Sequence, residues 1–126
     1  MVGFLAVAAG GAIGSLLRYG VNISAESLIG RGFPWATLTV NVIGSLVMGF
    51  LAGFLAEKYA DQPELRLFLL TGVLGGFTTF SAFSLDVFNL MQRGDHSMAI
   101  IYAVASVVLS IIAVFAGLMI SRAIIA

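Results

Sequence analysis

The stretch GVLGGFTTFSAFS, from Gly72 to Ser84, decides the fold of this chain. It lies inside an uncharged run from Leu67 to Leu85, which is about the length needed to cross a hydrocarbon core of roughly 30 Å. Three glycines and two adjacent β-branched threonines make it a weak helix. Backbone groups freed at membrane depth cost several kcal/mol each if they face lipid. We therefore predict an interrupted spanning helix whose break faces protein, water or an ion.

The composition is that of an integral membrane protein. Of 126 residues, 60% are hydrophobic and only 10% are charged, and the mean hydropathy is +1.10, far from the balance of a soluble domain. The formal net charge is zero, which gives no electrostatic basis for binding nucleic acid. The chain has no cysteine and one histidine, so thiolate chemistry and a histidine-based metal site are excluded.

Charged residues divide the sequence into four apolar segments joined by short connections. We predict an all-α fold of four transmembrane helices in a single domain, residues 1–126. The expected helices cover residues 2–20, 33–57, 65–92 and 96–124, and the third is broken near residues 75–79.

The distribution of Lys and Arg bears on orientation, because positive loops normally stay in the cytoplasm. With four spans the two sides carry equal numbers, so insertion in both orientations, or dual topology, is plausible. One side would hold Lys58, Arg66 and Arg122, and the other Arg18, Arg31 and Arg93.

Small residues four positions apart favour close helix packing in membranes. Three pairs made of two glycines occur, Gly10 with Gly14, Gly49 with Gly53, and Gly72 with Gly76. They either join the helices of one monomer or contribute to an oligomer. Because four helices leave little interior for a pathway, we favour an oligomer.

Two of the expected helices carry polar side chains at a spacing of four, which places each set on one helical face. Hydroxyls that bond their own helix, and an Asn that clamps a neighbouring helix, are the ordinary explanation. Together with an interrupted helix, however, the two sets offer hydrogen-bond donors without a formal charge. The sets are Thr37, Asn41 and Ser45 in the second helix, and Tyr102, Ser106 and Ser110 in the fourth.

Neutral donors without acidic partners favour an anion pathway over a cation or proton pathway. Asp86 is the only acidic residue close to a span interior. Arg18 is expected at the end of the first helix, either as an interfacial anchor or as an attractor of anions. Phe80 and Phe83 are three residues apart and share a face, and are either core packing or rings whose positive edges meet a small anion.

At these residues the sequence resembles the Fluc family of fluoride-specific ion channels, the CrcB type. GVLGGFTTFSAFS is similar to the family signature GxxGGxTTFSTF, with Ala82 in place of the usual threonine. Further similarities are LRY at Leu17 to Tyr19, TLTVN at Thr37 to Asn41, and the polar series that begins at Tyr102. Length and four-span layout agree too, so the resemblance covers nearly the whole chain.

The resemblance implies an antiparallel, dual-topology homodimer in the cytoplasmic (inner) membrane, with two fluoride pores and a structural Na⁺ at the dimer centre. The implied fluoride pore is lined by Asn41, Phe80, Phe83, Tyr102, Ser106 and Ser110. Backbone carbonyls of Gly75 and Thr78 would hold the Na⁺, and Arg18 would lie in the anion vestibule. The implied function is passive, non-enzymatic fluoride export that gives fluoride resistance.

Two other function classes compete with this interpretation. A small proton-coupled multidrug exporter shares the size and dual topology but needs a membrane-embedded carboxylate, which the first helix lacks. A purely structural membrane protein would account for the glycine pairs, but it would leave the two sets of polar side chains unexplained. Proton dependence of transport separates the exporter from a channel, and absence of any flux would favour a structural role.

Overall fold

The computed structural model describes all 126 residues, Met1 to Ala126, and is helical almost throughout. Its elements in chain order are α1 (Val2–Leu28), α2 (Trp35–Lys58), α3 (Pro63–Arg66), the π-helix η1 (Leu67–Leu74), α4 (Gly75–Phe77), α5 (Ser81–Gln92) and α6 (His96–Ile125). Four segments are long and apolar enough to cross a membrane: α1, α2, the run from Pro63 to Gln92, and α6. The structure thus confirms an all-α membrane protein with four spans.

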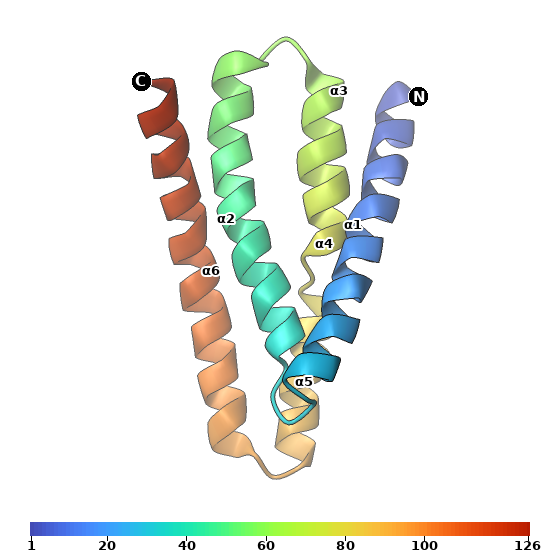
Figure 1. Cartoon of the computed structure of the whole chain (residues 1–126), viewed down its shortest axis with the longest axis vertical. Helices are drawn as coiled ribbons and strands as arrows, with labels where there is room; N and C mark the ends of the chain where they lie inside the picture. The colour runs from blue at the N-terminus through green and yellow to red at the C-terminus, as the bar shows by residue number, and fades with distance from the viewer.

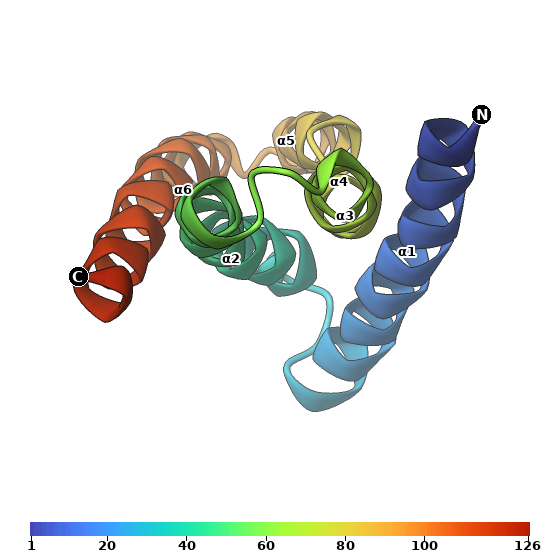
Figure 2. The same ribbon diagram turned by 90° about the horizontal axis from the view of Figure 1, so that it is seen from above.

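The four segments run alternately up and down, and α2 lies between α6 and the run that contains α3, η1 and α4 (Figure 1). Seen from above, α1 lies at the edge of the bundle and α6 at the opposite edge (Figure 2). Both chain termini lie at the same end of the molecule, together with the α2–α3 connection (Figure 1). This arrangement is the one that an even number of spans requires.

The first helix is longer than its apolar sequence predicts. It continues to Leu28, whereas we expected an end near residue 20, because helix formation does not stop where hydrophobicity falls. The chain turns away at Gly30, two residues after the helix, whose φ of 100° is a left-handed conformation that glycine adopts most readily. Arg18 therefore lies inside α1, and its expected position at a helix end is wrong.

Glycines bring the helices into close contact in two places. A Cβ at Gly10 or Gly14 of α1 would collide with the backbone of η1, at the carbonyls of Phe68 and Val73 respectively. In the same way, a Cβ at Gly49 of α2 would meet the backbone of α6. These contacts need the absence of a side chain, since the backbones themselves touch.

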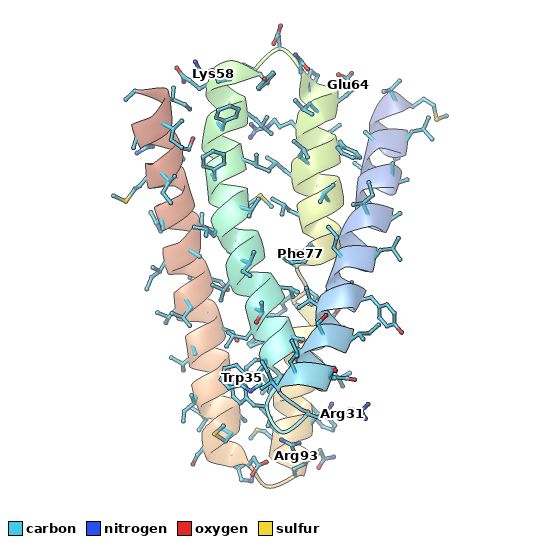
Figure 3. The ribbon with its side chains drawn as sticks, in the orientation of Figure 1. Arg31, Trp35, Lys58, Glu64, Phe77 and Arg93 are labelled. Carbon is cyan, nitrogen blue, oxygen red and sulfur yellow. The ribbon has the colours of Figure 1, made fainter.

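Charged side chains gather at the two ends of the bundle. Lys58 and Glu64 lie at one end, and Arg31 and Arg93 lie at the other (Figure 3). Over the whole chain, only 17 of the 126 residues are buried, and most large apolar side chains are exposed. A single chain therefore offers apolar surface to lipid or to another protein along its whole length.

Candidate functional site

The third span loses its helical conformation between α4 and α5. α4 ends at Phe77, Thr78 is extended with a φ of −84° and a ψ of 159°, and α5 begins at Ser81. Thr78 closes the end of α4 with both of its donors, because its N–H and its Oγ1 bond the Leu74 carbonyl at 3.0 and 2.9 Å. The Thr78 side chain thus adds a second hydrogen bond to the last helical bond at this end of α4.

We refer to the non-helical residues 78–80 as the interruption. Asn41 of α2 bridges it. Its Nδ2 donates to the Thr79 carbonyl at 2.9 Å, and its Oδ1 accepts from the Thr79 N–H at 2.8 Å. Both polar groups of one non-helical peptide residue are therefore satisfied by one amide side chain. This arrangement matches the requirement that backbone freed at membrane depth be paired with protein.

Arg18 contacts the interruption from the opposite side, on α1. Its Nε donates to the Gly76 carbonyl at 3.1 Å, close to the carboxyl end of α4. The partial negative charge at a helix carboxyl end favours a cation there. Arg18 is half-buried, and this contact explains how the charge is accommodated within a spanning helix.

Two carbonyls at the interruption have no such partner. None of the side-chain hydrogen bonds, and none of the backbone hydrogen bonds outside the helices, ends on the carbonyl of Gly75 or Thr78. Gly75 is exposed in the single chain, and Thr78 is half-buried. Carbonyls at the carboxyl end of a half-helix, such as that of Gly75, and unwound carbonyls, such as that of Thr78, are oxygen ligands that bind Na⁺ in transporters, so these two groups fit such an ion chemically.

A polar cavity of about 270 Å³ lies beside the interruption, between α2 and α6. Its wall contains hydroxyl, amide and aromatic groups but no charged side chain. We refer to it as the polar cavity, and its lining residues are Asn41, Ser45, Thr78, Thr79, Phe80, Phe83, Ser106, Val107, Ser110 and Ile111.

Most of the pore residues expected from the sequence meet in this cavity. The five that line it are Asn41, Phe80, Phe83, Ser106 and Ser110. The rings of Phe80 and Phe83 pack against each other, with centroids 5.3 Å apart and ring planes at 57°. Phe83 is 9% exposed and Phe80 is 74% exposed, so a single chain covers one ring and leaves the other open.

Tyr102 and Arg18 do not line the polar cavity. Tyr102 is fully buried behind Phe83, with the two ring centroids 5.3 Å apart. Its hydroxyl donates to Asp86 Oδ2 at 2.9 Å. The spacing of four along α6 placed Tyr102 on the correct face, but the depth at which it would meet Phe83 depends on how α5 packs against α6.

Ser106 is the buried donor in the wall of the polar cavity. It is 5% exposed, and its Oγ has no hydrogen-bond partner. A buried hydroxyl without a partner costs free energy unless a ligand or water pairs with it. Its position in the cavity wall makes it a candidate for direct contact with an anion.

Ser45 and Thr79 also line the polar cavity, although neither is among the pore residues expected from the sequence. Ser45 lies on the polar face of α2, and its spacing of four from Asn41 is the signal that identifies it. Thr79 is positioned by Asn41, and its Oγ1 accepts from the Ala82 N–H at 3.1 Å. That contact depends on the path of the non-helical residues, which spacing does not reveal.

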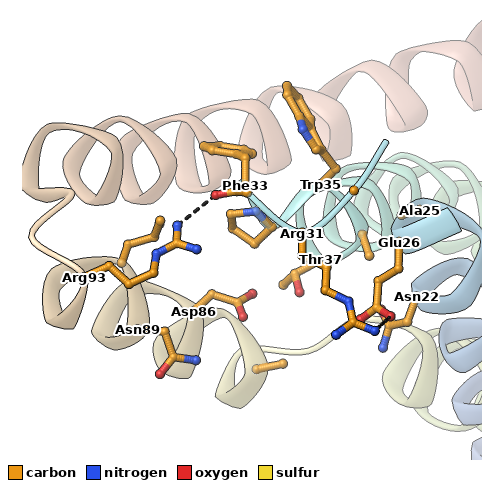
Figure 4. A pocket seen from close by; sticks show the side chains of 16 residues that line it. Asn22, Ala25, Glu26, Arg31, Phe33, Trp35, Thr37, Asp86, Asn89 and Arg93 are labelled. Atoms are coloured by element: carbon orange, nitrogen blue, oxygen red, sulfur yellow. Dashed lines mark hydrogen bonds and ion pairs between the residues drawn. The ribbon is translucent and has the colours of Figure 1, made fainter. Parts of the chain in front are cut away.

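A second pocket of about 320 Å³ opens near the α1–α2 connection and α5. We call it the outer pocket; Figure 4 shows the Asp86 carboxylate beside it and Arg93 reaching toward the α1–α2 connection. It contains both signs of charge, namely Glu26 and Asp86 with Arg31 and Arg93. The polar face of α2, which carries Thr37, Asn41 and Ser45, extends from the outer pocket to the polar cavity. Thr37 lines the outer pocket, and Asn41 lines the polar cavity.

Known proteins are similar to this sequence over nearly its full length. A family model described as "CrcB-like protein, Camphor Resistance (CrcB)" matches residues 5–118. A protein of Rhizobium meliloti named "Fluoride-specific ion channel FluC" is 56% identical over 119 residues, which cover 94% of this chain and 95% of the relative. A protein of Hyphomonas neptunium with the same name is 54% identical over 127 residues, which cover 100% of each.

Proposed function

This chain belongs to the CrcB-like protein family, and on that premise we propose that it is a passive, fluoride-selective ion channel. Its relatives in Rhizobium meliloti and Hyphomonas neptunium carry the name of a fluoride-specific ion channel. Such a function requires no covalent chemistry, so the protein is not an enzyme. Its place is a membrane that it crosses several times, and we propose the cytoplasmic membrane.

The polar cavity is the observation that carries this proposal. It brings neutral hydroxyl and amide groups together with two phenylalanine rings in an otherwise apolar span. Fluoride is small and strongly hydrated, so it leaves water only where several donors replace its hydration shell. The Ser106 hydroxyl is unpartnered, and aromatic rings offer positive edges to an anion.

The absence of charge in the cavity wall favours conduction over tight binding. A channel must bind its ion well enough to admit it and weakly enough to release it. We propose that fluoride passes along Asn41, Ser106 and Ser110 and meets the edges of Phe80 and Phe83. Tyr102 supports the Phe83 ring from behind. Arg18 raises the local anion concentration near the interruption.

The driving force is the membrane potential. Hydrogen fluoride crosses membranes as a neutral weak acid and dissociates in a more neutral cytoplasm. A negative interior then favours exit of the anion by about 2.3 kcal/mol per 100 mV. A passive pathway is therefore sufficient to protect the cell from fluoride.

We propose that the working unit is an antiparallel homodimer of dual-topology subunits. The equal number of Lys and Arg residues on the two sides supports insertion in both orientations. The exposure of Phe80 in the single chain, at 74%, supports a second copy that covers the open side of the polar cavity. Gly75, at the interruption, is exposed in the single chain as well.

We also propose that a Na⁺ ion binds between the two copies. The carbonyls of Gly75 and Thr78 in each subunit would hold it, since neither accepts a side-chain hydrogen bond. When bound, the ion supplies a fixed positive charge to these carbonyls. No cluster of three or more His, Cys, Asp or Glu side chains is available for another metal.

Liposomes loaded with fluoride test the proposed function. With purified protein, Na⁺ present and valinomycin added to clamp the potential, a fluoride electrode should record rapid efflux, while parallel chloride-loaded vesicles retain their anion. Retention of fluoride by folded protein would contradict the channel. Acceleration of transport by a proton gradient, with organic cations as substrate, would instead support an exporter.

A further inference from the structure

Five aromatic rings form a continuous chain from the α1–α2 connection to the interrupted span. Each ring packs against the next, and the chain ends at the ring pair of the polar cavity. In order the rings belong to Trp35, Phe33, Tyr102, Phe83 and Phe80, and successive centroids lie 4.6, 5.4, 5.3 and 5.3 Å apart.

The ring geometries are those of direct, specific contacts. Phe33 meets Tyr102 at an interplanar angle of 86°, and Tyr102 meets Phe83 at 49°. Edge-to-face and tilted pairs at these separations are the arrangements that aromatic quadrupoles favour. A rotation of one ring therefore changes the space that its neighbour occupies.

The outer end of this chain is held in place by the connection that carries Phe33. Arg93, just beyond α5, donates from Nη2 to the Gly32 carbonyl at 2.8 Å, as Figure 4 shows. Pro34 follows Phe33 directly and restricts the backbone there. The connection is thus tied to the helix that carries Phe83.

Tyr102 is the intermediate ring, and it is restrained at its hydroxyl as well as on its ring. The hydroxyl bonds Asp86 at 2.9 Å, while Phe33 and Phe83 contact the ring. Phe33 is partly buried against the cluster that contains Phe83 and Tyr102. Loss of the Phe33 ring would leave a space beside Tyr102 into which that ring can turn about its fixed hydroxyl.

We propose that Phe33 is a positioning residue of the channel: through Tyr102 it fixes the orientation of the Phe83 ring, and so the edge that Phe83 presents to the anion. Phe33 itself does not line the polar cavity. The inference rests on the proposed function, because it concerns the Phe83 ring that the proposed pathway uses.

Three variants test this inference by fluoride efflux from liposomes. Phe33→Leu removes the ring and keeps an apolar side chain, and Phe33→Tyr keeps the ring. Phe54→Leu is the matched control, since Phe54 stacks on Phe50 in α2, away from the chain of five rings. Efflux by Phe33→Leu should be roughly ten-fold slower, the most that one aromatic pair is worth. Phe33→Tyr and Phe54→Leu should conduct at close to the normal rate.

The single tryptophan of the chain gives a second measurement, which reports ring packing and does not depend on transport. Trp35 packs against Phe33 at the outer end of the ring chain, with ring centroids 4.6 Å apart. Its emission spectrum should stay unchanged in Phe33→Tyr and Phe54→Leu, and it should shift in Phe33→Leu.

The possible outcomes separate this inference from the proposed function. Normal efflux by Phe33→Leu, or equal slowing by Phe54→Leu, would overturn the role of Phe33 while leaving the channel intact. A Trp35 emission spectrum of Phe33→Leu identical to that of the unmodified protein would also overturn it, because the ring chain would then keep its packing without the Phe33 ring. Retention of fluoride by the unmodified protein would instead contradict the channel itself.

Discussion

Asn41 pairs with both backbone groups of Thr79, at 2.9 and 2.8 Å, across the interruption of the third span. The two residues are 38 positions apart in sequence, so this contact joins α2 directly to the non-helical residues. Asn41 is therefore a structural clamp and a wall residue of the polar cavity at once.

Asn41→Ala should lower both stability and flux. It leaves the N–H and the carbonyl of Thr79 unpaired at membrane depth, which costs about 1–3 kcal/mol per group. Thermal unfolding in detergent should show a clear fall in the midpoint. Ser45→Ala, one turn along the same face, is the control, because Ser45 makes no side-chain hydrogen bond and should leave the midpoint unchanged. Equal midpoints for all three proteins would refute the clamp.

Arg18→Gln should destabilise the interruption by removing a charge-assisted bond to the Gly76 carbonyl. Bonds of this kind contribute about 1.5–3 kcal/mol, and partial exposure of Arg18 brings the expected loss to the lower end of that range. Thermal unfolding measures it. Arg122→Gln is the control, because Arg122 is exposed and makes no hydrogen bond through its side chain. A midpoint for Arg18→Gln no lower than that of Arg122→Gln would argue against the contact.

Ser106 and Ser121 form a matched pair, since each has a buried Oγ without a partner. Ser106 lines the polar cavity, whereas Ser121 lies toward the carboxyl end of α6. Replacing either with alanine removes an unsatisfied polar group, so stability should stay equal or rise. Fluoride efflux should fall in Ser106→Ala alone. A similar efflux rate in the two variants would mean that the Ser106 hydroxyl does not contact the ion.

Phe80→Ile and Phe83→Ile should both impair fluoride efflux, but they should differ in stability. Phe80 is 74% exposed in the single chain and Phe83 only 9%. In monomeric protein, Phe83→Ile should lose roughly 1–2 kcal/mol through poorer packing, and Phe80→Ile close to none. Chemical unfolding of dilute protein tests this difference. Normal efflux in either folded variant would exclude that ring from the pathway.

Removal of Na⁺ should weaken both the dimer and the flux. The carbonyls of Gly75 and Thr78 lack other partners, so without a cation they repel one another across the proposed interface. Efflux and size-exclusion profiles in Na⁺ should be compared with those in N-methylglucamine at equal ionic strength, which controls for screening. If neither the profile nor the rate depends on Na⁺, the proposed ion site is wrong.

The four spans could be predicted from the sequence because hydropathy and length alone determine which segments cross a bilayer. The end of α1 could not, since the polar residues after Arg18 are compatible with helix, and the chain turns only at Gly30. Four of the ten cavity residues, Asn41, Ser45, Ser106 and Ser110, followed from a spacing of four along two helices. The partners of Tyr102 and Arg18 did not, because Asp86 and Gly76 reach them only through the packing of α5 against α6 and of α4 against α1.

The placement of both termini at one end of the bundle has a consequence for gene fusion. If two copies are joined directly, carboxyl end to amino end, the second copy begins on the side where the first one finished, and both are inserted the same way up. An antiparallel pair on one polypeptide therefore needs an additional hydrophobic helix of roughly 20 residues between the copies. A concatemer built with a transmembrane linker should conduct as a single polypeptide, whereas one built with a flexible soluble linker should conduct only when it pairs with a second polypeptide inserted in the opposite orientation.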